Sequence, residues 1–172
     1  KSYFHQWVGS REFLNNVERF CLWTGDASPS DLRSMPAVME RIDLVRRYRR
    51  GEVPAKGKDP ISKNLKRNKQ TQELAATPTR FHVENFPSRQ YMVIPEVSSQ
   101  RRDYIPFGYV APPTMASNLV KVLPDATPYV FGVLSSQMHM DWTRQVAGRL
   151  KGDYRYSIRL VYNNYPWPEN PT

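Results

Sequence analysis

The sequence has few of the residues that most catalytic and metal sites require. Its single cysteine, Cys21, excludes a disulfide framework and leaves no cysteine pair with zinc-ligand spacing. The three histidines, His5, His82 and His139, have no histidine or carboxylate three or four positions away that would suggest a zinc site on a helix. No Gly-x-Gly pattern occurs, so a nucleotide or S-adenosylmethionine loop is not expected. The sequence therefore predicts no catalytic residue and no metal site in this chain.

Long hydrophobic runs are also missing. No apolar stretch approaches the roughly 20 residues that a membrane span needs, and no signal peptide begins the sequence. The chain starts at Lys1 and ends without a closing element. We therefore expect one domain, residues 1–172, of a longer cytoplasmic protein without a membrane partner.

The positive charge is concentrated in one part of the chain. Residues 41–69 contain eleven Lys/Arg and three acids, so they carry +8 of the net charge of +9. This pattern is typical of a protein that binds a polyanion, although a solvated and flexible basic loop would give the same pattern. Residues 51–70 are polar, basic and interrupted by Pro and Gly, which predicts a mobile basic loop.

Local patterns predict a mixed α+β fold. Ser28 and Pro29 predict a helix start, Ser34 a second cap before Pro36, and Gly51 the end of the longer helix. Further helices are expected at 68–76 and 135–147, and strands at 91–94, 104–110, 119–122, 129–134 and 156–162. Fifteen prolines suit a single irregular domain in which short, Pro-punctuated strands pack with a few helices.

Two aromatic motifs close the sequence, YRYS at 154–157 and YNNYPWP at 162–168. They are compatible with a packed aromatic corner, a base-stacking surface or the remnant of a catalytic loop. An Asn-Pro-Pro-Tyr loop, which holds a flipped base in amino-methyltransferases, is excluded because both prolines follow Tyr165. We expect Tyr154, Tyr156, Tyr165 and Trp167 to pack the closing edge of the domain.

Five sequence blocks in the same order resemble one family over about residues 7–168. The blocks are ASPSDLR with MPAVMER at 27–41, PEVSSQRRDYIP at 95–106, SSQMHM at 135–140, GRLKGDYRYS at 148–157 and YNNYPWP at 162–168. Together they resemble the target recognition domain of MmeI-type enzymes. These are large bacterial DNA adenine methyltransferases, many of them fused to a nuclease, in the type IIL restriction–modification class.

The resemblance implies a partner and a place in a larger enzyme. The domain would recognise a short double-stranded DNA sequence for methyltransferase, and in many members nuclease, domains of the same polypeptide. It would hold no cofactor itself, whereas S-adenosylmethionine, and Mg²⁺ for a nuclease, would be bound elsewhere in a bacterial cytoplasmic enzyme. Two alternatives are a scaffold or protein-interaction domain of such an enzyme and, less compatible with the missing motifs, a self-sufficient nuclease or methyltransferase.

The segment 98–103 is the strongest candidate for base recognition because it offers hydroxyl, amide, guanidinium and carboxylate groups in six consecutive positions. Arginine pairs with guanine, glutamine with adenine, and aspartate accepts from cytosine. An extended segment would place Gln100 and Arg102 on one side and Arg101 and Asp103 on the other, where the latter two could equally form a structural ion pair. The base-contacting candidates are Ser98, Gln100, Arg101, Arg102, Asp103 and Tyr104.

Phosphate contacts are expected from cations inside and beside the basic stretch. The candidates are Arg46, Arg47, Arg50, Lys63, Lys66, Arg67, Lys69, Arg80, Arg89 and Arg155. Part of the arginine excess at 46–50 can instead belong to the helix, because cations near a helix C-terminus interact favourably with its dipole.

Overall fold

The computed structural model describes residues 3–53, 66–84 and 86–169. Helices and strands both occur, so the α+β class predicted from the sequence is confirmed. The chain divides into two compact units, a helical unit within residues 22–84 and a β-rich unit within residues 2–21 and 85–172. Most of the predicted basic loop, residues 54–65, lies outside the described residues. None of the helices in the described ranges is long and apolar enough to cross a membrane.

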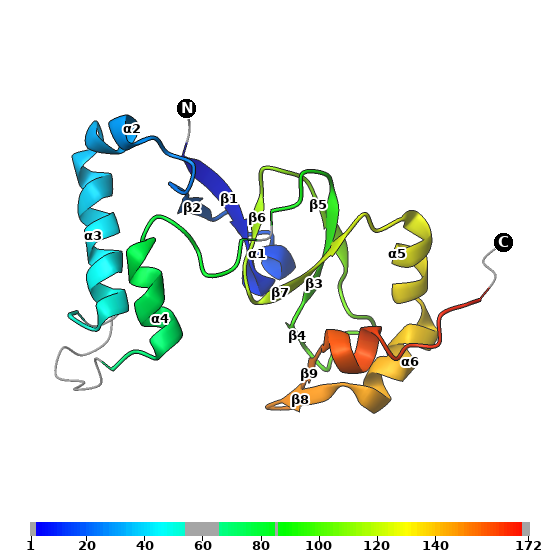
Figure 1. The fold of residues 1–172 in the computed structure, drawn as a ribbon. Coiled ribbons are helices and arrows are strands. Elements are labelled where there is room, and N and C mark those ends of the chain that lie inside the picture. The colour runs from blue at the N-terminus through cyan, green and yellow to red at the C-terminus, as the bar shows by residue number, and fades with distance from the viewer. Residues whose placement is uncertain (1–2, 54–65, 85, 170–172) are drawn as a thin grey trace. The chain divides into compact units, whose positions relative to one another are not determined.

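The helical unit contains α2 (Pro29–Arg33), α3 (Pro36–Arg50), α4 (Lys69–Glu73) and the 3-10 turn η1 (Leu74–Ala76) (Figure 1). The Ser28 hydroxyl accepts the Asp31 N–H at 3.1 Å and begins α2, as predicted. Gly51 ends α3 with a positive φ of 81°. The predicted cap at Ser34 was wrong: Met35 precedes α3 without a side-chain cap, and the Ser34 hydroxyl donates to the Asp31 carbonyl.

The β-rich unit contains three small sheets. Their strand orders are β2 (Phe20–Leu22), β1 (Phe4–Val8) and β6 (Met115–Ala116); β5 (Gly108–Val110), β3 (Tyr91–Pro95) and β7 (Val120–Pro124); and β4 (Val97–Ser98), β9 (Asp153–Arg155) and β8 (Gly148–Leu150). Its helices are α1 (Ser10–Asn15), α5 (Pro128–Leu134), α6 (Gln137–Val146) and the π-helical turn η2 (Ile158–Tyr162) (Figure 1).

Strand β3 forms the centre of this unit. It pairs antiparallel with β5 on one edge and β7 on the other, and all its side chains are buried. Because strand side chains alternate between faces, Tyr91 and Val93 join one apolar cluster and Ile94 joins a second one. The second cluster contains Tyr154 and Tyr156 from the closing motif, which confirms that this motif packs the domain.

Two predicted strands were wrong. Residues 129–134 form helix α5, because Thr127 caps it through the Val130 N–H at 3.3 Å and Pro128 occupies its first turn. In the region 156–162 the strand ends at Arg155, and the Ser157 hydroxyl accepts the Leu160 N–H at 3.3 Å to begin η2. In both places a cap outweighs the strand preference of β-branched and aromatic residues.

Candidate nucleic-acid interface

The segment between β4 and β5 leaves the sheet through a tight turn. The Arg102 N–H donates to the Ser99 carbonyl at 3.1 Å, and the Arg101 N–H donates to the Ser99 hydroxyl at 3.3 Å. Buried residues hold both ends, since Ser98 is 2% exposed and Ile105 is 3% exposed. Between them, residues 100–104 are all exposed to solvent. The turn therefore presents five consecutive polar, charged or aromatic side chains.

This geometry corrects two parts of the sequence interpretation. The segment is a turn and not an extended strand, so the predicted alternation of Gln100 and Arg102 against Arg101 and Asp103 was wrong. The Ser98 side chain points into the unit beside its cross-strand partner Tyr154, and this burial speaks against a base contact from Ser98. Within the described residues, Arg101 and Asp103 form no ion pair with each other, so their charges remain available.

The β8–β9 hairpin meets this turn. Its two-residue loop, Lys151-Gly152, has positive φ at both positions, 51° and 96°, as a tight antiparallel hairpin requires. An Asp153 carboxylate oxygen accepts the Gln100 backbone N–H at 3.1 Å. A Cβ on Gly152 would lie 3.3 Å from the Gln100 amide nitrogen, so glycine here serves both the turn and the close approach. We call residues 99–104 together with 148–155 the loop–hairpin surface.

The two faces of the hairpin have different roles. Tyr154 is 5% exposed and faces the core, so its neighbours Asp153 and Arg155 point to the opposite, outer face. The Arg149 guanidinium lies 3.9 Å from the centre of the Tyr154 ring and donates to the Gly152 and Arg144 carbonyls, both at 3.3 Å. Arg149 therefore stabilises the hairpin, whereas Lys151 is exposed at its tip.

Three cations without carboxylate partners lie together on the loop–hairpin surface. Among the described residues, Arg101, Arg102 and Lys151 have no carboxylate partner within ion-pair distance. Elsewhere in the unit Arg89 pairs with Asp125 at 2.9 Å. Unpaired cations beside amide and carboxylate groups can bind phosphates and base edges at the same time. Sequence reasoning missed Lys151 and Asp153, although the Lys-Gly turn signal between two short strand-like runs could have identified the hairpin.

Most of the predicted phosphate-binding cations have carboxylate partners. The pairs are Arg46–Asp43 at 3.3 Å, Arg47–Glu52 at 3.6 Å, Arg50–Glu52 at 3.8 Å, Lys69–Glu73 at 4.0 Å, Arg80–Glu84 at 2.7 Å and Arg155–Glu96 at 3.0 Å. Apart from Arg155–Glu96, whose carboxylate is only 20% exposed, these exposed pairs contribute only about 0–1 kcal/mol, so a phosphate can compete for their cations. Lys66 is exposed, and Lys63 lies outside the described residues.

Arg67 has a structural position. Its Nε donates to the Tyr48 carbonyl at 2.9 Å, its Nη2 donates to the Val53 carbonyl at 3.1 Å, and its guanidinium lies 4.1 Å from the centre of the Tyr48 ring. The two carbonyls lie in the last turn of α3 and just after it, so Arg67 holds the end of this helix against the segment before α4. This geometry favours a capping role for Arg67 over the predicted phosphate contact.

Arg49 has a similar role, which the sequence did not reveal. It donates to the carbonyls of Leu74 and Thr77, both at 2.8 Å, and to the Arg80 carbonyl at 2.7 Å. Burial lowers the pKa of Arg49. The guanidinium thus joins α3 to the segment after α4.

Replacing Arg67 by alanine is expected to lower the free energy of unfolding of the helical unit by about 1–3 kcal/mol, because the carbonyls that it bonds lose charged donors. Lys66→Ala, which removes an exposed neighbouring cation, is the matched control and should change stability by less than about 0.5 kcal/mol. Urea unfolding followed by circular dichroism measures both. Equal stability of the two variants would contradict the capping role.

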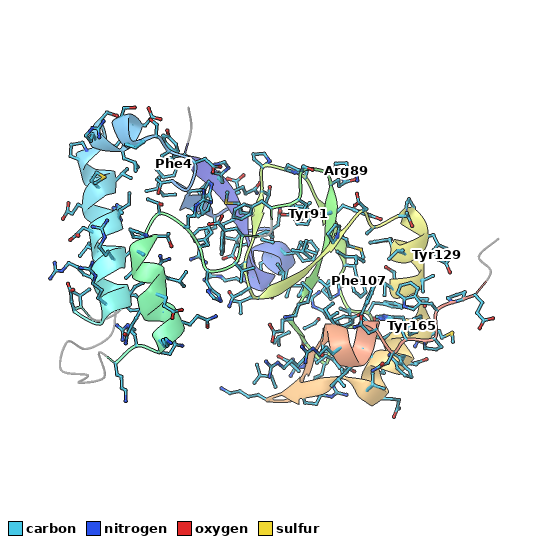
Figure 2. All side chains as sticks on the ribbon, in the orientation of Figure 1. Phe4, Arg89, Tyr91, Phe107, Tyr129 and Tyr165 are labelled. Carbon is cyan, nitrogen blue, oxygen red and sulfur yellow. The ribbon has the colours of Figure 1, made fainter. Side chains whose placement is uncertain are left out.

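A buried histidine contacts Tyr156, the residue that follows β9 of the hairpin. His139 on α6 is fully buried, its Nε2 lies 3.0 Å from the Tyr156 hydroxyl, and its ring centre is 4.9 Å from that of Tyr165. Phe107 and Tyr165 both lie in this part of the β-rich unit, near α6 (Figure 2). Burial lowers the pKa of His139 to about 4. The side chain is therefore a neutral part of the core.

This burial predicts acid sensitivity. The folded-state pKa of His139 is below its ordinary value of 6.5, so between these values the unfolded chain binds a proton that the folded chain does not. We expect the His139 contribution to stability to be complete above pH 6.5 and to fall by about 3 kcal/mol as the pH drops to 4. Urea unfolding at pH 8, 6 and 4 measures it. His139→Asn should lack this component, and an unchanged pH profile in that variant would contradict the assignment.

No group of three or more His, Cys, Asp or Glu side chains within the described ranges is arranged to hold a metal ion.

Comparisons with known proteins match the whole chain. The family model of the MmeI target recognition domain matches residues 1–169. DNA methyltransferase A of Bacillus subtilis (strain 168) is 41% identical over 170 residues, which cover 99% of this chain and 18% of that protein. A solved structure of the Type IIL restriction–modification enzyme MmeI in complex with DNA aligns with a TM-score of 0.85 and 41% identity over 98% of this chain and 21% of that chain. The chain thus spans about a fifth of the length of these relatives.

Proposed function

The chain belongs to the family of MmeI target recognition domains, and from this premise we propose that it recognises a short sequence of double-stranded DNA. The domain would direct adenine methylation by other domains of the same polypeptide, and DNA cleavage where that polypeptide carries a nuclease. The observation that carries the proposal is the loop–hairpin surface, where unpaired cations lie beside exposed amide and carboxylate groups. Cations of this kind bind phosphates and guanine, and amide and carboxylate groups bind other base edges.

Within this surface we assign base contacts to Gln100 and Arg102, whose side chains are exposed on the turn. Lys151 and Asp153 on the hairpin supply a further donor and a further acceptor. Arg101, Asp103 and Tyr104 remain candidates for base or backbone contacts. The Asp153 bond to the Gln100 N–H fixes the turn against the hairpin, so the two groups of side chains approach DNA together.

We assign phosphate contacts to Lys66 and to the cations whose ion pairs with exposed carboxylates are weak. They are Arg46, Arg47, Arg50, Lys66, Lys69, Arg80 and Arg89, with Lys63 retained from the sequence prediction. Each would add affinity for any DNA sequence and would make binding depend on salt. Arg67 is left out of this set because α3 uses its donors.

The parent protein would be a bacterial cytoplasmic DNA adenine methyltransferase that binds S-adenosylmethionine outside this chain. A nuclease domain, where present, would need Mg²⁺. The catalytic groups would lie in those other domains, and this chain would supply the choice of DNA sequence. The mixed character of the loop–hairpin surface favours this function over a scaffold role, for which unpaired arginines on an exposed turn serve no purpose.

Binding of the full-length protein to duplex DNA distinguishes the two functions. We expect affinity to fall steeply with salt and to fall in parallel on all sequences when Lys66 and Lys69 are both changed to glutamine. A scaffold domain would leave affinity and its salt dependence unchanged in this double variant. Fluorescence anisotropy at several salt concentrations measures the affinity and its salt dependence. One duplex contains the sequence that the protein methylates, and the other contains the same bases in shuffled order.

A further inference from the structure

A groove of about 530 Å³ lies beside the outer face of the hairpin, and the base contacts assigned above do not use it. Its lining includes Arg155 at the end of β9 and Gly148 at the start of β8. Residues 156–160, which run from the end of β9 into η2, also line it.

Three cations and one acid line this groove. Glu96 accepts Nε and Nη2 of Arg155 on one oxygen, at 3.1 and 3.0 Å, and Lys121 on the other at 3.2 Å. Burial raises the pKa of the Glu96 carboxyl, but the hydrogen bonds from Arg155 and Lys121 outweigh this effect and keep the pKa below its usual value. The carboxylate is therefore ionised and holds both cations in place. With the exposed Arg159, the lining carries a net charge of +2.

Glu96 does not use all the donors of its two partners. Arg155 carries five N–H donors and Lys121 three, and in the described structure Nη1 of Arg155 has no partner. The Ser157 hydroxyl accepts the Leu160 N–H and keeps its own hydrogen to donate. Arg159 has no carboxylate partner among the described residues. The groove thus presents spare donors from four side chains toward a site with a net positive charge.

Part of the groove lining is apolar. It consists of Tyr156, Ile158 and Leu160, of which Leu160 is 54% exposed. An anion carried on a group with apolar C–H faces fits such a lining better than a free inorganic ion does. A DNA backbone offers this combination, since each phosphate is joined to deoxyribose rings.

We propose that this groove binds the DNA backbone next to the recognised bases, with a phosphate held by Arg159 and the spare donors of Lys121, Arg155 and Ser157. The inference rests on the proposed DNA-recognition function. The groove would supply one DNA phosphate contact on the β-rich unit, in addition to the phosphate contacts assigned above to cations of the helical unit. A phosphate held here would set the register of the hairpin on the duplex without reading sequence.

The test uses the full-length protein and duplex DNA that contains the sequence that this protein methylates. Arg159→Gln is expected to lower the magnitude of the slope of log affinity against log salt by about 1, because one phosphate contact is lost. Lys121→Gln should act in the same direction. Arg11→Gln, which removes an exposed cation of α1 outside the groove, is the matched control and should change the slope by much less. The methylated sequence should stay the same in all three variants.

The outcomes separate the two proposals. If the unaltered protein binds DNA with steep salt dependence but Arg159→Gln behaves like Arg11→Gln, the groove assignment is wrong and the DNA-recognition function stands. A changed methylated sequence in Arg159→Gln would also overturn it, because the contact would then be to a base. If the unaltered protein shows no salt-dependent binding, the proposed function itself fails.

Discussion

Replacing Arg102 by alanine is expected to weaken binding to the recognised DNA sequence by about 5- to 150-fold, while binding to a shuffled sequence changes little. The exposed guanidinium on the turn is free of any carboxylate partner within the described residues. It can therefore make a bidentate contact to a base edge worth about 1–3 kcal/mol of discrimination. Competition binding of the full-length protein to the two duplexes measures the ratio of the affinities.

Arg102→Lys is the control for this experiment, because lysine keeps the charge but lacks the planar fork that pairs with guanine. We expect Arg102→Lys to lose most of the discrimination and to keep the affinity for shuffled DNA. If alanine weakens both duplexes equally, Arg102 contacts a phosphate and not a base. Full discrimination in Arg102→Lys would contradict a bidentate contact that needs the planar fork.

Replacing Tyr156 by alanine is expected to lower the free energy of unfolding of the β-rich unit by about 3–5 kcal/mol. This side chain is 1% exposed, and its backbone N–H donates to the Glu96 carbonyl at 2.8 Å. Its ring packs against Phe107, with ring centres 5.9 Å apart. Loss of the ring leaves a cavity under the hairpin, so stability and recognition should fall together. Thermal or urea unfolding measures the first effect.

Tyr156→Phe separates packing from hydrogen bonding. It removes only the hydroxyl that lies 3.0 Å from Nε2 of His139, and it should cost about 1–2 kcal/mol. The recognised sequence should stay the same in this variant. If Tyr156→Ala is as stable as Tyr156→Phe, the aromatic cluster does not hold the hairpin in place.

Local signals in the sequence predicted the elements that local contacts determine. Ser28 caps α2 as its residue type indicated, and Asn68 and Ser136 cap the two helices that the sequence predicted at 68–76 and 135–147. The apolar run 91–94 forms the buried central strand β3. Where two local signals conflicted, at residues 129–134, composition favoured a strand and the Thr127-Pro128 cap decided for a helix.

Contacts between residues far apart in the sequence could not be predicted in the same way. The capping role of Arg67 depends on carbonyls fourteen and nineteen residues away, and the role of Arg49 on carbonyls up to 31 residues away. In the sequence these arginines are indistinguishable from the cations that remain exposed. The approach of the 148–155 hairpin to Gln100 joins residues about fifty positions apart. The candidate turn could therefore be predicted from the sequence, whereas the approach of the hairpin to it could not.

The most direct test of the central proposal is a map of the DNA sites that the full-length enzyme methylates. The map would compare the unaltered enzyme with a Gln100→Ala, Arg102→Ala double variant expressed in a host without other adenine methylation. We expect the variant to methylate a relaxed or altered sequence, while its binding of S-adenosylmethionine is unchanged. The same methylated sequence in both enzymes, at comparable levels, would contradict the proposal that this surface chooses the DNA sequence.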